Sequence, residues 1–305
     1  MYNRECFIAR AINSCLYQHF DNFELIVVDD GSTDKSCEIV KNYFDPRITL
    51  ISHKINRGVG PARNTGVSVA KGDWVIFLDS DDELLQESLS LIYKRCTEVA
   101  YDISRLYFMG QIDTGELSPN PPLKNELIDY IKYIKWMESC YGRLQDAMPV
   151  VKRNTFKYIR FYDGRTLECP YHLDFMKQFF AWSFSDVVAL YHQDANNQLT
   201  KPNIHRTLQG AHDQSISEEL LLQTHGEALK IHAPRVYRQH ISGMATLFFL
   251  CGDRQKGIKF CLQSFKCNFF SIRSWIILLF GLIGPKHLAW LKNFRTRLYQ
   301  MNIWK

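Results

Sequence analysis

The chain has 305 residues, 46% of them hydrophobic and 23% charged, so it can bury a large core and intrinsic disorder is excluded. Its nine Cys residues are scattered and include no CxxC pair, which excludes a disulfide framework and a zinc site of closely spaced pairs. The net charge of +5 is uneven, because the segment from Arg254 to Lys305 contains ten Lys or Arg and no Asp or Glu, and this predicts an anionic partner surface for that end.

The first hundred residues alternate between helical and strand patterns. Apolar spacing predicts helices over 5–17, 34–44, 61–70 and 84–100. Runs rich in β-branched and aromatic residues predict strands over 23–28, 48–51, 74–78 and 103–108. Strands that alternate with helices predict an α/β fold with a mainly parallel, Rossmann-like sheet flanked by helices, which binds ligands at the carboxyl ends of its strands.

The second half of the chain is less regular. Residues 110–122 read as a loop and 125–140 as a helix, while 141–200 show no clear period. From Ser217 onward the pattern is helical, with breaks near Pro234 and Gly252. We therefore expect an α/β domain over 1–215 and a helical, basic region over 216–305.

Two acidic clusters follow predicted strands directly. Asp29-Asp30-Gly31 comes after the strand 23–28, and Asp79-Ser80-Asp81-Asp82 comes after the strand 74–78. A parallel sheet would bring both clusters to one rim, where carboxylates repel one another unless a cation balances them. Hard divalent ions such as Mg²⁺ and Mn²⁺ bind one or two carboxylates together with substrate phosphates. The pattern predicts a metal–diphosphate site, and the alternative is that these Asp residues only form turns and cap helices.

Five motifs in order resemble those of the family 2 glycosyltransferases of the A-type fold, over about residues 2–100. The motifs are Asn3-Arg4-Glu5, the stretch from Glu24 to Asp34 (ELIVVDDGSTD), Asn56-Arg57-Gly58, Ala62-Arg63-Asn64-Thr65-Gly66, and Phe77-Leu78-Asp79-Ser80-Asp81-Asp82. The resemblance implies inverting transfer of a sugar from a nucleotide-sugar donor to a glycan or lipid-linked acceptor, with Mn²⁺ or Mg²⁺ as cofactor.

The resemblance also implies roles for individual residues. The donor-binding set is Tyr2, Asp29, Asp30, Arg63 and Asp79, with Asp81 as the metal ligand. Tyr2 would lie against the base, and Asp30 would accept a hydrogen bond from it, usually from uracil, which favours a UDP-sugar. Arg63 would line the donor site, where its fork suits phosphate or carboxylate. Asp79 would approach the ribose or a metal-bound water.

The catalytic base is where this sequence departs from the family. The family supplies the base as the Asp of a Glu-Asp pair, and the stretch from Phe161 to Cys169 resembles the segment that leads to it. Here Cys169 stands in the place of that Asp, and a thiol with a reference pKa of about 8.5 is mostly protonated at neutral pH. The candidates for the base are therefore Glu168 and Asp174. The family also opens with an apolar strand before its Tyr-Asn pair, so we expect the natural chain to extend upstream of Met1.

The C-terminal region contains an apolar stretch followed by basic residues. The charge-free part from Ser274 to Pro285 is too short to span a bilayer, which needs about 20 apolar residues. Basic residues from Lys286 to Arg297 then alternate with Trp290, Leu291 and other apolar residues. This mixture predicts a helix that lies on an anionic leaflet, with the protein peripheral at the cytoplasmic, inner face of the cell membrane. The alternative is a helix packed on the catalytic domain, and no nucleic-acid-binding motif accompanies the basic residues.

The sequence thus predicts a glycosyltransferase of bacterial surface-polysaccharide or lipopolysaccharide synthesis, a setting that rests on analogy. Two other functions remain open. Cys169 and the departure at the start favour a catalytically silent protein that binds sugar nucleotides or acts as a scaffold. A nucleotidyltransferase would also combine a nucleotide, a carboxylate-held metal and an α/β sheet, but it normally has a Gly-rich, basic loop after its first strand.

Overall fold

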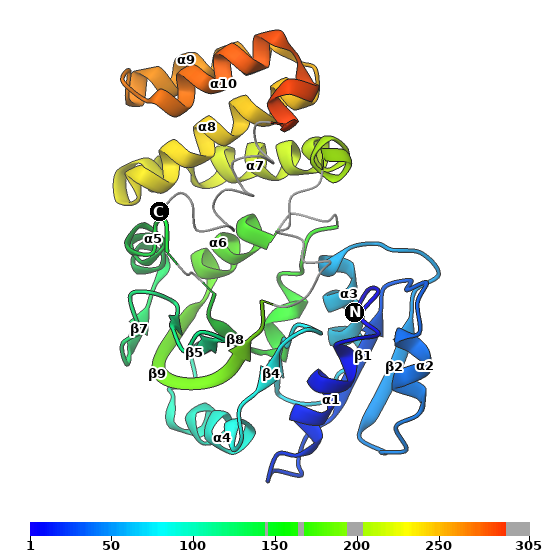
Figure 1. Cartoon of the computed structure of the whole chain (residues 1–305). Helices are drawn as coiled ribbons and strands as arrows, with labels where there is room; N and C mark the ends of the chain where they lie inside the picture. Colours follow the sequence, from blue (N-terminus) through cyan, green and yellow to red (C-terminus); the bar gives the residue numbers. More distant parts are fainter. Residues whose placement is uncertain (144–145, 164–167, 194–203, 291–305) are drawn as a thin grey trace. The chain divides into compact units, whose positions relative to one another are not determined.

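The computed structural model describes residues 1–143, 146–163, 168–193 and 204–290 (Figure 1). The chain divides into two compact units, Met1–Ala195 and Asn196–Lys305. Helix α7 (Ile204–His232) is continuous across residue 215, where the sequence predicts the boundary. The structure therefore places the division about twenty residues earlier along the chain.

The first unit alternates helices and strands, and every element predicted within the first 108 residues is present. Its helices are α1 (Ile8–Leu16), α2 (Ser36–Lys41), α3 (Val59–Val69), α4 (Ser88–Glu98), α5 (Tyr130–Ser139), the short 3₁₀ helix η1 (Arg153–Lys157) and α6 (Glu168–Gln178). Its strands are β1 (Leu25–Asp29), β2 (Ile48–Ser52), β3 (Trp74–Ile76), β4 (Glu83–Leu84), β5 (Ile103–Ile112), β6 (Leu117–Ser118), β7 (Glu126–Ile128), β8 (Met148–Lys152) and β9 (Phe180–Tyr191).

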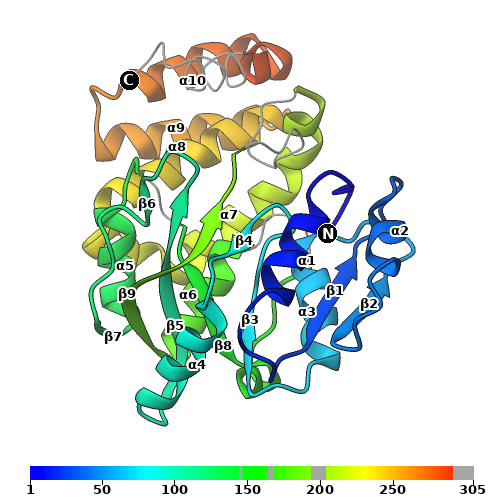
Figure 2. The same ribbon diagram turned by 60° about the horizontal axis from the view of Figure 1, so that its bottom comes forward.

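The strands form two sheets, and the larger one is mixed. β1 and β2 pair in parallel, with Leu25 opposite Ile48, and Figure 2 shows them beside α1, α2 and α3. The larger sheet has the order β3-β8-β5-β9-β4, in which β5 runs parallel to β9 and antiparallel to β8. Only two of the seven described pairings are parallel. The expectation of a mainly parallel sheet is thus wrong, because β8 and β9 come from the stretch in which the sequence shows no period.

The segment predicted as a single helix over 125–140 contains both a strand and a helix. Residues Glu126–Ile128 form β7, which pairs with β9. The helix α5 begins only after Asp129, whose carboxylate accepts a hydrogen bond from the amide of Lys132 at 2.7 Å. This N-cap satisfies a backbone donor that the first turn leaves open, so the helix starts there.

The core of the first unit lies on the larger sheet. Leu106 and Phe108 from β5, Val150 from β8 and Val188 from β9 are fully buried and pack together with Ile92 of α4. A smaller cluster joins α1, β1 and α2. Full burial of a large apolar side chain contributes about 1.5–3 kcal/mol, so these positions stabilise the sheet whose strand β3 leads to the acidic turn.

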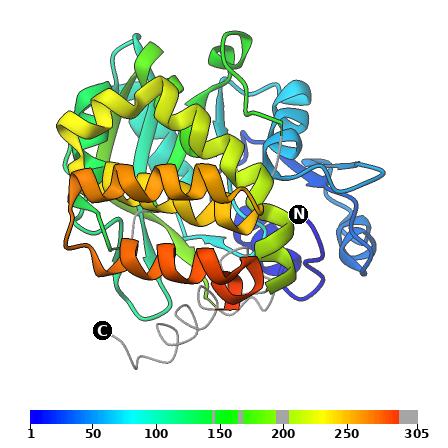
Figure 3. The same ribbon diagram turned by 90° about the horizontal axis from the view of Figure 1, so that it is seen from above.

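The second unit is helical. It contains α7, α8 (Pro234–Leu250), α9 (Arg254–Cys267) and α10 (Ile272–Ile283), which Figure 3 shows from above. The predicted breaks are confirmed, since Pro234 occupies the first turn of α8 and Gly252 adopts a φ of +83° between α8 and α9. None of the described helices is both long enough and apolar enough to cross a bilayer.

Candidate active site

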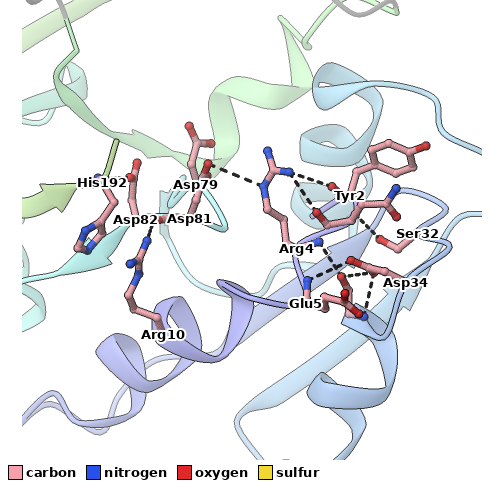
Figure 4. Close-up of polar contacts among 12 residues, drawn as sticks. Tyr2, Arg4, Glu5, Arg10, Ser32, Asp34, Asp79, Asp81, Asp82 and His192 are labelled. Carbon is pink, nitrogen blue, oxygen red and sulfur yellow. Dashed lines mark hydrogen bonds and ion pairs between the residues drawn. The ribbon is translucent and has the colours of Figure 1, made fainter. Parts of the chain in front are cut away.

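The first residues of the chain are tied to the loop that follows β1. Ser32 Oγ accepts a hydrogen bond from the amide of Asn3 at 2.9 Å, and Asn3 Oδ1 accepts one from the amide of Thr33 at 2.8 Å. Tyr2 is exposed, and its ring extends beyond these polar contacts (Figure 4). The structure thus presents an open aromatic surface at the position where the sequence predicts contact with a nucleotide base.

Asp30 is buried, and its carboxylate faces the loop between β2 and α3. Oδ1 accepts a hydrogen bond from the amide of Arg57 at 3.0 Å and lies 2.8 Å from His53 Nδ1. Oδ2 accepts from the amide of Gly58 at 2.7 Å. The contacts of Asp30 therefore organise the loop 53–58 and do not lead to Asp81.

Asp29 is the second buried carboxylate of this strand end. Its Oδ1 accepts a hydrogen bond from the amide of Ser32 at 3.1 Å. Beside it, the amino group of Met1 donates to the carbonyl of Val28 at 2.6 Å, and the carbonyl of Met1 accepts from the amide of Asp30 at 2.8 Å. Met1 thus lies beside β1 and makes the two backbone hydrogen bonds that a neighbouring parallel strand would make. Asp29 stabilises the turn that follows β1.

Asp79 and Asp81 occupy the turn between β3 and β4. Asp81 Oδ2 lies 3.8 Å from Arg4 Nε, and only 16% of the Asp81 side chain is exposed. Burial raises the pKa of Asp81, Arg4 lowers it, and the neighbouring Asp79 raises it further. Asp79 is far more open, with 62% of its side chain exposed. Figure 4 shows both carboxylates beside Arg4, so the turn presents one recessed and one accessible acid.

Arg63, on α3, connects this turn to α6. Its Nη2 donates to Asp79 Oδ1 at 3.2 Å and its Nη1 to Glu168 Oε1 at 2.9 Å. The guanidinium also lies over the rings of Phe77 and Phe161, 5.6 and 5.4 Å from their centroids. Burial disfavours its charge, but the two carboxylates outweigh burial and raise the pKa of Arg63. One guanidinium thus brings a residue of the acidic turn next to Glu168, which is 105 positions away from Arg63 in sequence.

A seam of close contacts joins α3 to the segment that precedes α6. Asn64 Nδ2 donates to the carbonyl of Phe161 at 2.7 Å, and Asn64 Oδ1 accepts from the amide of the same residue at 3.0 Å. Gly60 lies so close to this segment that a Cβ atom would sit 2.4 Å from the carbonyl oxygen of Tyr162. Gly60 therefore permits the approach of two backbone segments, a role that the glycine-rich pattern alone does not reveal.

Replacing Gly60 by Ala is expected to lower the free energy of unfolding by about 1–3 kcal/mol, because a methyl group must displace the backbone at Tyr162. Urea unfolding measures this loss. The matched control is Gly66→Ala in the same helix, where the nearest atom would be Val28 Cγ2 at an ordinary 3.5 Å. There we expect a gain of up to about 1 kcal/mol from helix propensity. Equal stability of the two variants would contradict the close approach at Gly60.

Glu168 and Asp174 both lie on α6, but only Glu168 reaches Arg63. Six residues of helix separate them by about 120° around the axis. Burial raises the pKa of Glu168, Arg63 lowers it, and Asp79 raises it. Asp174 instead accepts a hydrogen bond from the phenol of Tyr162, and burial together with this carboxylate raises the pKa of Tyr162 to about 12. Of the two sequence candidates, the structure brings Glu168 into the cluster with Asp79.

Two further carboxylates act on this cluster. Burial raises the pKa of Asp82 to about 8, although the amide of His192 donates to it at 3.0 Å. Asp146, just before β8, has a pKa raised by burial and by Asp79, and its charge in turn raises the pKa of Glu168. The sequence offered no signal for Asp146, which stands alone in an irregular stretch. Carboxyl groups are thus concentrated at this site, and burial together with their mutual repulsion raises their pKa values.

This concentration of acids suits a divalent cation. Among the described ranges of the chain, no three His, Cys, Asp or Glu side chains form a ready-made metal site. Mg²⁺ and Mn²⁺ commonly bind one or two protein carboxylates and take their other ligands from phosphates and water. The recessed Asp81 beside the accessible Asp79 fits that mode, since a divalent cation would offset the repulsion between the two carboxylates.

Arg105 of β5 anchors α6, and no sequence pattern singles this residue out. It is fully buried in β5 and donates hydrogen bonds to Tyr107 Oη at 2.9 Å and to Tyr171 Oη at 3.3 Å, while its guanidinium stacks 3.6 Å from the ring centroid of Phe175. Burial and the nearby guanidinium of Arg105 lower the pKa of His172 well below its usual value, so this imidazole is neutral. Tyr171, His172 and Phe175 all belong to α6, so Arg105 holds the helix that carries Glu168 in place.

Comparison with known proteins agrees with this geometry. The profile of Glycosyl transferase family 2 matches residues 1–148. An uncharacterized glycosyltransferase of Haemophilus influenzae is 33% identical over 185 residues, which cover 58% of this chain and 70% of that protein. The Escherichia coli protein WfaP, named as a UDP-Glc:alpha-D-GlcNAc-diphosphoundecaprenol beta-1,3-glucosyltransferase, is 30% identical over 161 residues, 52% of this chain and 62% of its own length. The alignments span between 15 and 70% of the length of such relatives.

The fold agrees as well. The crystal structure of S. aureus TarS in complex with UDP-GlcNAc superposes with a TM-score of 0.61 at 18% sequence identity, over 99% of this chain and 90% of that one. At this identity the likeness shows the A-type fold, with a mixed sheet flanked by helices and a helical C-terminal region. Together with the sequence matches, it establishes that the chain belongs to glycosyl transferase family 2 and is a glycosyltransferase.

Proposed function

We propose that the chain transfers a sugar from a UDP-sugar to a glycan or lipid-linked acceptor in polysaccharide synthesis, with inversion at the anomeric carbon. The observation that carries this proposal is the fork of Arg63, which brings the accessible Asp79 and the α6 carboxylate Glu168 to the two sides of one guanidinium. The name of WfaP, which specifies a UDP-linked glucose donor and a diphosphoundecaprenol acceptor for that protein, supports the choice of donor and acceptor class.

In the proposed reaction the donor lies along the rim between Tyr2 and Asp79. The exposed ring of Tyr2 would stack on the base, and the accessible Asp79 would accept a hydrogen bond from the ribose or from a water of the bound metal. Asp29 holds the turn at Ser32, and Asp30 holds the loop 53–58 through the amides of Arg57 and Gly58. In this proposal the buried Asp30 supports the donor site from its interior and does not make the direct contact with the base that the resemblance implies. Asp81 holds Mn²⁺ or Mg²⁺, which when bound offsets the negative charge that develops on the leaving diphosphate.

Glu168 acts as the base in this proposal. The acceptor oxygen forms the new bond to the anomeric carbon, its proton passes to the Glu168 carboxylate, and the bond between the anomeric carbon and the UDP oxygen breaks. Partial burial raises the pKa of Glu168 towards the working pH, which makes the carboxylate a better proton acceptor. Arg63 orients the carboxylate, and Arg105 holds the helix that presents it.

We further propose that the protein works at the cytoplasmic face of the cell membrane, where a lipid-linked acceptor would be available. The basic, acid-free segment from Arg254 onward supports this setting. The residues 291–305, which hold Lys292, Arg295 and Arg297 of the predicted tail, lie outside the described residues. The structural support for this setting therefore comes from the described helices α9 and α10.

A donor screen tests the proposal. With a UDP-sugar at about 100 times its dissociation constant, mass action is expected to stabilise the protein by about 2.7 kcal/mol, which raises Tm by about 5–10 °C. Mn²⁺ should increase this shift, and incubation with the matching donor should release UDP. Stabilisation without any UDP release, even with acceptor lipids present, would favour a silent sugar-nucleotide-binding protein, in which Cys169 has replaced the family base.

A further inference from the structure

Helix α10 turns its large apolar side chains outward. The exposed residues of α10 are Ile272, Trp275, Ile276, Leu279, Leu282 and Ile283. Their spacing of one, three or four residues places them on one face of the helix. A helix on the surface of a water-soluble domain normally buries such a face. Here Leu279 is 60% exposed and Ile272 75% exposed, so the arrangement is reversed.

The buried face of α10 is made of small residues. Ser274 and Gly281 face inward together with Ile277. Ser274 Oγ lies 2.7 Å from Ser264 Oγ of α9, and the ring of Phe249 packs so closely on Gly281 that a Cβ there would come within 2.4 Å of it. Small residues at helix contacts are typical of helices that keep their large side chains for lipid. The inner side of α10 thus packs through Ser274, Ile277 and Gly281, with Leu278 and Phe280 partly buried, while the six exposed apolar residues lie outside this packing.

Helix α9 and the turn after it extend the same apolar surface. Ile258, Leu262 and Phe269 are exposed at spacings of four and seven residues, and they line a shallow groove along α9. In the turn that joins α9 to α10, Phe270 is 86% exposed. Figure 1 shows the two helices side by side, and we call their exposed apolar residues, from Ile258 to Ile283, the α9–α10 face.

The charged residues that line this groove are lysines. Lys259 and Lys266 are exposed on α9 and line the same groove, and Lys286 is exposed just after α10. The segment from Arg254 to Lys305 contains no acidic residue. Lysines around an apolar surface complement a layer that is anionic outside and apolar beneath, since each Lys near such a surface contributes to binding.

We propose that the α9–α10 face is a monotopic membrane-binding surface that inserts Phe270 and the outer residues of α10 into the interface of an anionic bilayer, with Lys259 and Lys266 against the lipid phosphates. The proposal rests on the proposed setting at the cell membrane, and it assigns the membrane contact to α9 and α10. No described helix can span the bilayer, so the helices lie along its surface.

The test measures binding of the full chain to vesicles by flotation. We expect binding to phosphatidylglycerol–phosphatidylcholine vesicles and at least about tenfold weaker binding to pure phosphatidylcholine, because the lysines lose their partners. The double variant Phe270→Ser/Leu279→Ser should weaken binding to the anionic vesicles at least about tenfold. Lys259→Gln/Lys266→Gln should weaken it as well and reduce its dependence on salt.

The matched control is Phe44→Ser/Tyr101→Ser, which removes two almost fully exposed aromatic side chains from the first unit and should leave binding unchanged. Circular dichroism and Tm check that the variants keep their helices. We expect them to do so, because the substituted side chains are exposed. Two results would overturn the proposal: vesicle binding that Phe270→Ser/Leu279→Ser does not alter, or a dimer in vesicle-free solution that this variant dissociates. Neither measurement requires sugar transfer, so a failure of the membrane proposal can be distinguished from a failure of the donor screen.

Discussion

Replacing Glu168 by Gln is expected to lower kcat about 10²–10⁴-fold, while the donor-induced rise in Tm changes little. A Gln side chain keeps the size of the residue and can still face Arg63, but it cannot take the proton of the acceptor hydroxyl. The measurement is UDP release at saturating donor and acceptor, together with the thermal shift. A variant that lost donor binding and kept its turnover at saturation would show that Glu168 is a donor ligand and not the base.

The pH dependence of the wild type provides a second readout for the same residue. A base must be deprotonated, so kcat should be high above the pKa of Glu168 and fall as the pH drops through it. Burial and the neighbouring acids raise that pKa above the usual value of 4.5, so the fall should begin at a higher pH than for an exposed Glu. The acid limb should vanish in Glu168→Gln.

Asp174→Asn is the control for the base, because it makes the same change on the same helix. Its carboxylate contacts the phenol of Tyr162 and lies on another face of α6. We expect kcat to stay within about threefold of the wild type, because Asp174 does not take part in the proposed proton transfer. A large loss of kcat in Asp174→Asn, with little change in Glu168→Gln, would reverse the assignment.

Replacing Asp81 by Asn is expected to lower turnover at least about 10²-fold and to remove its response to Mn²⁺, because the recessed carboxylate is the proposed metal ligand. The fold should remain intact, since removing a buried charge whose pKa is already raised leaves less charge to desolvate. Titration with Mn²⁺ in the presence of UDP, followed by the change in Tm, measures the effect.

The comparison variant is Asp73→Asn. Asp73 is an exposed carboxylate just before β3, the strand that leads into the turn of Asp81. It should keep both turnover and the Mn²⁺ response. Retained metal-dependent turnover in Asp81→Asn would remove Asp81 from the metal role and leave Asp79 and Asp82 as the remaining carboxylates on this turn.

Local chemistry in the sequence was sufficient to place the acidic turn. Asp79 and Asp81 directly follow an unbroken apolar run, so the strand and the turn could be predicted from neighbouring residues. The predicted sheet edge shared with Asp29 and Asp30 is not found, because β1 and β3 belong to different sheets. Asp30 was also placed correctly at a strand end. Its orientation into the loop 53–58 could not be predicted, because it depends on backbone amides more than twenty residues away.

The position of Glu168 depends on contacts that no local sequence pattern contains. The bond from Arg63 to Glu168 spans 105 residues and crosses a stretch without clear periodicity. Arg105 lies inside a strand pattern, where a charged residue suggests an exposed edge, yet tertiary packing buries it completely. The residues of β7 share the helical spacing of α5, and only pairing with β9 makes them a strand.

The double hydrogen bond between Asn64 and Phe161 has a consequence for protein engineering. Chimaeras that combine the donor half of one relative with the acceptor half of another would naturally be joined near residue 150, where the family profile ends. Such a crossover separates Asn64 and Gly60 from the backbone that they fit. Grafts that carry residues 58–66 together with the incoming segment 161–168 take both sides of this joint from one parent, and they are the recombinants expected to keep the contact between Arg63 and Glu168.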